Sequence, residues 1–171
     1  MKDNSQLSQQ KYNDYLNFPK TLLCSIAFLG LYTAVYSAQN IQSVLFEKDG
    51  FGSLGFYCNA AAYLAQAIGT VFCIYFMEKI GCVKTMTIGS WMTVPFIISL
   101  IFPALKSKYS DSDNFFLAKG FVYPIMIITS MILGYGAGIS QPGSGKYISD
   151  CATEKTKGFY FAFFWSFYMG S

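Results

Sequence analysis

The stretch "LGFYCNAAAYLAQAIGTVFCIYFM", residues 54–77, contains no charged residue and is long enough to cross a lipid bilayer. A helix needs about 20 mostly apolar residues to span a hydrocarbon core about 30 Å thick. Uncharged sequence around this stretch begins at residue 50, and further long uncharged stretches cover residues 21–46, 85–105 and 120–145. The sequence therefore predicts four complete transmembrane helices, at about residues 21–41, 54–77, 85–105 and 119–140.

A fifth uncharged stretch, "GFYFAFFWSFYMGS", covers residues 158–171. It begins like another transmembrane helix and stops inside an apolar run, so we expect the chain to be a fragment of a longer protein. The alternative is a small multi-span protein whose last segment dips into the membrane, because a stretch this short can be interfacial or re-entrant. Both interpretations predict an all-α fold, a polytopic membrane helix bundle with four full transmembrane helices and a truncated fifth.

The composition argues against several classes of function. Charged residues make up only 12% of the chain, about half the share in soluble domains. All basic residues are lysine, so the bidentate phosphate contacts of arginine are missing and nucleic-acid binding is not expected. The chain has no histidine and no CxxC spacing, which argues against a metal site. The uncharged stretches contain no Asp, Glu, Lys, Arg or His, so we expect no catalytic site, no cofactor and no enzyme activity.

The lysines predict how the chain is oriented in the membrane. Residues 1–20 are polar, and the apolar run that follows is far longer than a signal-peptide core of 7–15 residues. We expect residues 1–20 to be a cytosolic tail and residues 21–171 to form the transmembrane bundle, because cytosolic segments carry an excess of Lys. This orientation leaves eight lysines in cytosolic segments and four opposite. The cytosolic set is Lys2, Lys11, Lys20, Lys79, Lys84, Lys146, Lys155 and Lys157, and the opposite set is Lys48, Lys106, Lys108 and Lys119.

The glycine-rich stretch "GYGAGISQPGSGKYISD", residues 134–150, is only partly like a phosphate-binding loop. That loop requires Gly-x-x-x-x-Gly-Lys-Ser/Thr after a β-strand. Here Ser140 takes the place of the first Gly, Tyr147 takes the place of the final Ser/Thr, and a transmembrane helix precedes the stretch. We therefore expect the stretch to end that helix, and Lys146 to lie at the cytosolic headgroup level rather than to bind ATP.

Two groups of residues in the predicted helices are candidates for close packing or for a polar pathway. Small residues spaced four apart let helices approach closely, and they are Ala61, Ala65 and Gly69 in the second helix and Gly134 and Gly138 in the fourth. Amides in hydrocarbon need partners, and they are Gln39, Asn40 and Gln42 at the end of the first helix and Asn59 and Gln66 in the second. The amides either line a polar cavity or bond to a neighbouring helix. We expect Gln39 and Asn40 to face the bundle interior or the following loop rather than lipid.

Three stretches resemble the Unc-93-like family of the major facilitator superfamily. The loop "MEKIGCVKTM" (77–86) follows the superfamily's loop signature at Glu78, Lys79 and Gly81. The run "AQNIQSVLFEKDGFGSLG" (38–55) resembles the end of the family's first helix, and it places Gln39, Asn40 and Gln42 in the family's positions. The run "LGYGAGISQPGSGKYIS" (133–149) aligns without gaps to a family motif and matches it at Gly134, Gly138, Gly145 and Tyr147. It departs from the motif at Gln141, where the family has Trp, and at Ser144, where it has Gln.

The resemblance, which covers about residues 21–170, carries expectations about fold and function. It implies a bundle of two six-helix halves with the pathway between them, of which this chain would be an incomplete first half. It implies transport of a small solute that the sequence does not identify. The family also implies an alternative, a non-transporting regulator or trafficking partner of a membrane channel or receptor. At the loop after the second helix we expect Glu78, Lys79 and Gly81 to form a short cytosolic turn, in which Gly81 can adopt a positive φ.

Overall fold

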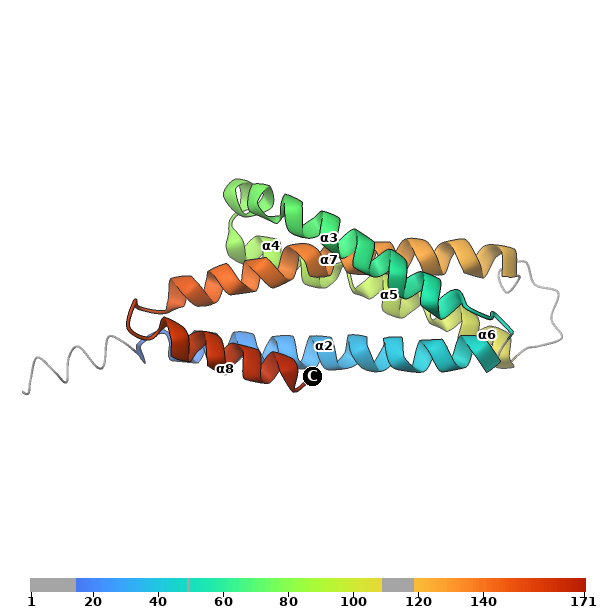
Figure 1. The fold of residues 1–171 in the computed structure, drawn as a ribbon, viewed down its shortest axis with the longest axis horizontal. Coiled ribbons are helices and arrows are strands. Elements are labelled where there is room, and N and C mark those ends of the chain that lie inside the picture. Colours follow the sequence, from blue (N-terminus) through green and yellow to red (C-terminus); the bar gives the residue numbers. More distant parts are fainter. Residues whose placement is uncertain (1–14, 49, 109–118) are drawn as a thin grey trace, which may run out of the picture. The chain divides into compact units, whose positions relative to one another are not determined.

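The computed structural model describes residues 15–48, 50–108 and 119–171 (Figure 1). In chain order the helices are α2 (Phe18–Lys48), α3 (Leu54–Ile80), α4 (Cys82–Trp91), α5 (Val94–Ser99), α6 (Ile101–Lys108), α7 (Lys119–Cys151) and α8 (Lys157–Met169). No strand occurs among the residues that the structure describes. The predicted all-α fold class is therefore confirmed.

Four helical segments are long and apolar enough to cross a membrane. They are Phe18–Lys48, Leu54–Ile80, Cys82–Lys106 and Gly120–Cys151. Large apolar side chains on these segments are exposed, with Leu23 at 71% and Val71 at 75%, as expected where helices face lipid rather than water. The chain is a multi-pass integral membrane protein, and the prediction of four spans is confirmed. The fifth predicted segment is present as α8.

The chain divides into two compact units. One comprises Met1–Thr33 and Ser144–Ser171, and the other comprises Ala34–Gly143, so α2 and α7 contribute to both. In the first unit, aromatic rings of α8 pack on those of α2. The ring centroids of the pairs Phe18–Phe163, Phe28–Phe164 and Tyr32–Tyr168 are 5.0, 5.5 and 4.9 Å apart, which is the usual spacing of edge-to-face pairs.

A buried apolar core holds the second unit together. It brings together the end of α2, the start of α3, α5 and the first half of α7. Its largest fully buried side chains are Phe46, Phe51, Leu54, Phe96 and Met126. The hydroxyl of Tyr123 also donates a hydrogen bond to the carbonyl of Phe51, which fixes the connection between α2 and α3 against α7.

The third predicted helix, residues 85–105, is present as the span Cys82–Lys106, but it is interrupted twice. α4 ends at Trp91 and α5 ends at Ser99, each four residues before a proline, Pro95 or Pro103. Proline has no N–H to donate, and its ring clashes with the carbonyl four residues earlier. Each proline therefore interrupts the helix one turn before itself, and the third span consists of three short helices.

The expectation that the fourth helix ends near residue 140 is wrong. α7 continues to Cys151, through the glycines and through Pro142. In a bilayer a backbone without internal hydrogen bonds is very costly, and this cost exceeds the weak helix propensity of glycine. Lys146 is accordingly a helical residue whose ammonium lies 2.7 Å from the carboxylate of Asp150, one turn later. The stretch is a helix rather than the loop that phosphate binding requires.

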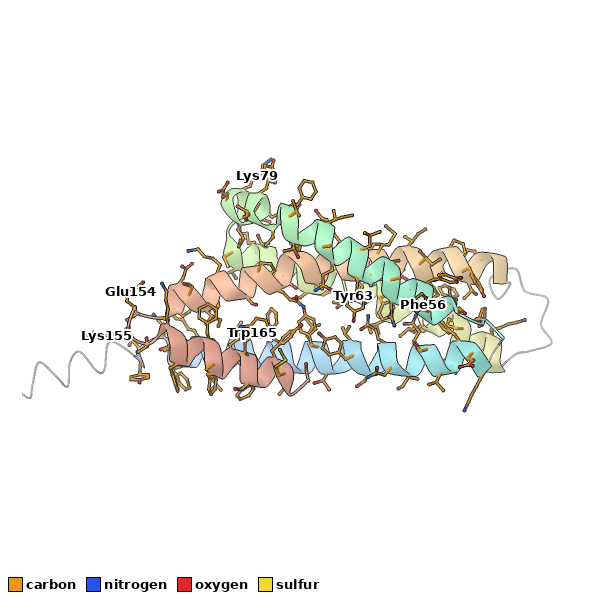
Figure 2. All side chains as sticks on the ribbon, viewed as in Figure 1. Phe56, Tyr63, Lys79, Glu154, Lys155 and Trp165 are labelled. Carbon is orange, nitrogen blue, oxygen red and sulfur yellow. The ribbon has the colours of Figure 1, made fainter. Side chains whose placement is uncertain are left out.

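A single residue, Gly81, connects α3 to α4, with φ 86° and ψ 157°. Glu78 and Lys79, which we expected to share the turn, instead belong to the last turn of α3, where both are exposed. There the ammonium of Lys79 donates to the hydroxyl of Tyr75 at 3.1 Å (Figure 2). The change of direction therefore depends on Gly81, because glycine adopts positive φ values without steric cost.

Candidate functional site

Glycines bring α3 and α7 into direct backbone contact. A Cβ atom on Gly134 would lie 1.9 Å from the carbonyl oxygen of Ala62, and one on Gly138 would lie 2.3 Å from the carbonyl oxygen of Gln66. In the same way, a Cβ on Gly69 of α3 would lie 2.6 Å from the carbonyl oxygen of Tyr135. The close-packing role that the sequence predicts for Gly134 and Gly138 is thereby confirmed.

α4 packs against α7 in the antiparallel direction. A Cβ on Gly89 or on Gly136 would lie 2.5 Å from the carbonyl oxygen of the other glycine. The thiol of Cys82 donates to the carbonyl of Gly143 at 2.8 Å. As residue numbers rise along α4, its contacts move to lower residue numbers on α7, so the two helices are antiparallel. Along α3 the contacts move to higher residue numbers on α7, so these two helices are parallel. This alternation is what consecutive membrane crossings require.

Gln66 and Gln141 form a hydrogen bond across the α3–α7 contact. The Nε2 atom of Gln66 donates to the Oε1 atom of Gln141 at 3.0 Å, and both side chains are partly buried. Of the two roles left open for Gln66, the structure therefore shows a bond to a neighbouring helix. Gln141, which departs from the family motif, is the residue that supplies the partner.

Gln42 is buried at a junction of three helices without a hydrogen-bond partner. Its side chain is 2% exposed, and it faces the thiol of Cys58 on α3 together with the hydroxyl of Ser130 on α7. The geometry falls short of regular hydrogen bonds, so the amide of Gln42 and the hydroxyl of Ser130 have no partner among the described residues. Beside Ser130 the hydroxyls of Thr129 and Ser99 are 2.9 Å apart. This part of the bundle interior is therefore polar.

A pocket of about 470 Å³ lies between the end of α2 and the start of α3. Its polar side chains come from Ser43 and Glu47 on α2, and from Ser53 and Asn59 at the start of α3. None of these four side chains forms a hydrogen bond or an ion pair with another residue in the described ranges. Phe56, on the first turn of α3, adds an aromatic ring that is 72% exposed (Figure 2). The structure thus places Asn59 in a mixed polar and aromatic pocket.

The other predicted residues lie outside this pocket. Gln39 is half-buried and Asn40 is exposed on α2. Gly145 and Tyr147 belong to the other compact unit, where a Cβ on Gly145 would meet no atom within 4 Å. The three loop-motif residues are at the opposite end of α3. Of the predicted site residues, only Asn59 lines the pocket, and only Gln42 belongs to the buried polar junction.

The sequence analysis did not name several residues at these sites as candidates. They include Ser43, Glu47, Ser53 and Phe56 in the pocket, and Cys58 and Ser130 at the junction. Glu47 follows the uncharged run and was assigned to the loop, but α2 continues to Lys48. Had the helix been extended, the four-residue spacing of Ser43 and Glu47 would have placed them on one face. Cys58 and Ser130 carry no comparable signal, since a lone cysteine usually behaves as a small hydrophobe.

The described residues contain no group of side chains suited to hold a metal ion. Comparisons with protein-family models, with curated proteins and with solved structures found no match for this chain.

Proposed function

We propose that the protein moves a small solute across its membrane, as its resemblance to the Unc-93-like family implies. The observation that carries the proposal is the amide of Gln42, which is buried in a membrane-spanning helix and has no hydrogen-bond partner among the residues that the structure describes. A buried polar group without a partner costs about 1–3 kcal/mol, so a bundle that only had to pack would be more stable with an apolar residue there. Polar groups retained at such cost inside membranes commonly mark a solute path.

The pocket between α2 and α3 fits the mouth of such a path. Ser43 and Gln42 are adjacent on α2, and Asn59 and Cys58 are adjacent on α3. One member of each pair lines the pocket, and the other belongs to the buried polar junction. Consecutive residues point about 100° apart on a helix, so the pocket and the junction lie on neighbouring faces of both helices, and we propose that a solute leaving water passes from the first to the second.

Uptake into proteoliposomes tests the proposal. Purified protein is reconstituted and offered labelled amines, amino acids, sugars and carboxylates, with protein-free vesicles as the blank. We expect uptake of at least one class, and we expect Gln42→Leu to slow it by at least about tenfold while stabilising the fold by about 1–2 kcal/mol. Asn40→Leu, which removes an exposed amide from the same helix, is the matched control and should do neither.

Two results would contradict the proposal. One is that no class of solute enters above the protein-free blank, which would favour the alternative of a non-transporting regulator or trafficking partner. The other is that Gln42→Leu transports at the normal rate while it stabilises the fold, because the amide would then be a packing defect rather than part of a path.

A further inference from the structure

Among the described residues, the pocket between α2 and α3 has one ionisable group in its lining, the carboxylate of Glu47. Lys48 follows Glu47 directly, but consecutive residues on a helix point about 100° apart, and Lys48 does not line the pocket. The pocket wall therefore carries one negative charge. Glu47 is exposed and forms no ion pair with any described residue, so this charge is free to meet a ligand.

The walls of the pocket are held in place by backbone contact. A Cβ on Gly55 would lie 3.0 Å from the Cα atom and 3.1 Å from the Oγ atom of Ser43, so α2 and α3 touch at this point. Ser43 and Glu47 are one turn apart on α2, as Gly55 and Asn59 are on α3. The same faces that make the contact thus continue into the pocket, which fixes the positions of Glu47 and Asn59 relative to each other.

We propose that this pocket binds a small organic cation, an amine attached to an aromatic or aliphatic body. Glu47 supplies the counter-charge, while the hydroxyl of Ser43 and the amide oxygen of Asn59 can accept the remaining N–H bonds of an ammonium group. The exposed ring of Phe56 offers a face both to the cation and to the apolar body. A volume of about 470 Å³ lies within the range of small-molecule pockets, about 300–1,000 Å³.

The pocket alone supports the binding of such a cation. That the same cation is the transported substrate rests on the proposed function. An anion or an uncharged solute fits less well. An anion would meet the carboxylate of Glu47, and an uncharged solute would leave that carboxylate without a counter-charge.

Binding of three compounds with one scaffold tests the charge requirement. The probes are 2-phenylethylamine, 2-phenylethanol and 3-phenylpropionate, which are cationic, neutral and anionic at pH 7, and binding to the purified protein in detergent is measured by calorimetry. We expect the amine to bind at least about tenfold more tightly than the alcohol, and the carboxylate to show no binding. Glu47→Gln should weaken amine binding at least about tenfold and leave alcohol binding unchanged, since one decade corresponds to about 1.4 kcal/mol.

Glu78→Gln is the matched control, because it removes the same charge from an exposed position at the other end of α3, and it should leave amine binding unchanged. Asn59→Ala is a second pocket variant, expected to weaken amine binding without loss of folding. Equal affinity for amine and alcohol, stronger binding of the carboxylate, or unchanged amine binding by Glu47→Gln would each overturn the inference. Amine binding that depends on Glu47, without uptake by proteoliposomes, would uphold the inference and contradict transport. Uptake of other solutes without amine binding would uphold transport and contradict the inference.

Discussion

Substitution of Gly134 by alanine should separate α3 from α7. The added Cβ would lie 1.9 Å from the carbonyl oxygen of Ala62 and 2.6 Å from its carbonyl carbon. An ordinary contact between carbon and a carbonyl oxygen is about 3.3–3.6 Å, so the two backbones must move apart by about 1.4–1.7 Å at this crossing. Both atoms that clash belong to backbone, and no side-chain rotation can relieve the contact.

The free-energy cost follows from this displacement. Overpacking a close-packed interior costs about 1–3 kcal/mol. A gap of only about 0.5–1 Å already removes a quarter to a half of the dispersion energy between facing atoms. We therefore expect Gly134→Ala to lower the free energy of unfolding by about 3 kcal/mol. The control is Gly145→Ala on the same helix, where nothing lies within 4 Å. It should be neutral, or stabilise by about 0.5–1 kcal/mol, because alanine is the better helix former.

Two measurements check the prediction. Equilibrium unfolding in mixed detergent micelles gives the difference in stability between the two variants. Thiol labelling, with the site identified by mass spectrometry, reports the contact itself, because Cys73 on α3 is fully buried and donates to the carbonyl of Ile139 on α7 at 3.2 Å. Gly134→Ala should speed labelling of Cys73, and Gly145→Ala should not. Equal stability of the two variants, with Cys73 equally protected in both, would refute the backbone contact.

Two further predictions concern single features of α3. Gly81→Ala should destabilise the protein by about 1–3 kcal/mol, because φ 86° with ψ 157° is a conformation open essentially to glycine alone. Thermal unfolding should show no such loss for the control Gly158→Ala. Equal melting temperatures of the two variants would contradict backbone strain at Gly81. For the hydrogen bond between Gln66 and Gln141, a double-mutant cycle with leucine at each position should give a coupling energy of about 0.5–1.5 kcal/mol. Additive single effects would mean that the two amides do not interact.

Much of the fold follows from the distribution of charge in the sequence, because charges are excluded from hydrocarbon whatever the details of packing. The uncharged stretches located the spans, and the spacing of Gly134 and Gly138 marked a close-packing face on the fourth helix without identifying α3 as its partner. The same reasoning placed the ends of the helices poorly. α2 continues to Lys48 and α7 to Cys151, since a helix does not end where its apolar run ends. It continues until the backbone takes another conformation, as it does at Gly81.

The candidate site was predictable only in part, because it depends on which faces of different helices meet. Gln42 and Asn59 stood out as amides within apolar sequence. Whether an amide finds a partner depends on residues far away in the chain, however. Gln66 meets Gln141 across a distance of 75 positions, whereas Gln42 faces a thiol and a hydroxyl that do not satisfy it. No periodicity within one helix distinguishes these two outcomes.

Differences in packing within the second unit indicate which of its segments would move during the transport cycle that we propose. α3 and α7 touch backbone to backbone at Gly134 and Gly138, so a movement that separates them loses contact energy along the whole crossing. The third span differs, because its helix is interrupted before Pro95 and before Pro103, whereas α7 stays one helix through Pro124 and Pro142. Bending at those interruptions breaks fewer helical hydrogen bonds. The end of α2 meets α3 and α7 through the amide of Gln42, which forms no hydrogen bond with a described residue. We therefore expect α3 and α7 to behave as one rigid pair, and the conformational change that transport requires to occur in the end of α2 and in the proline-interrupted third span.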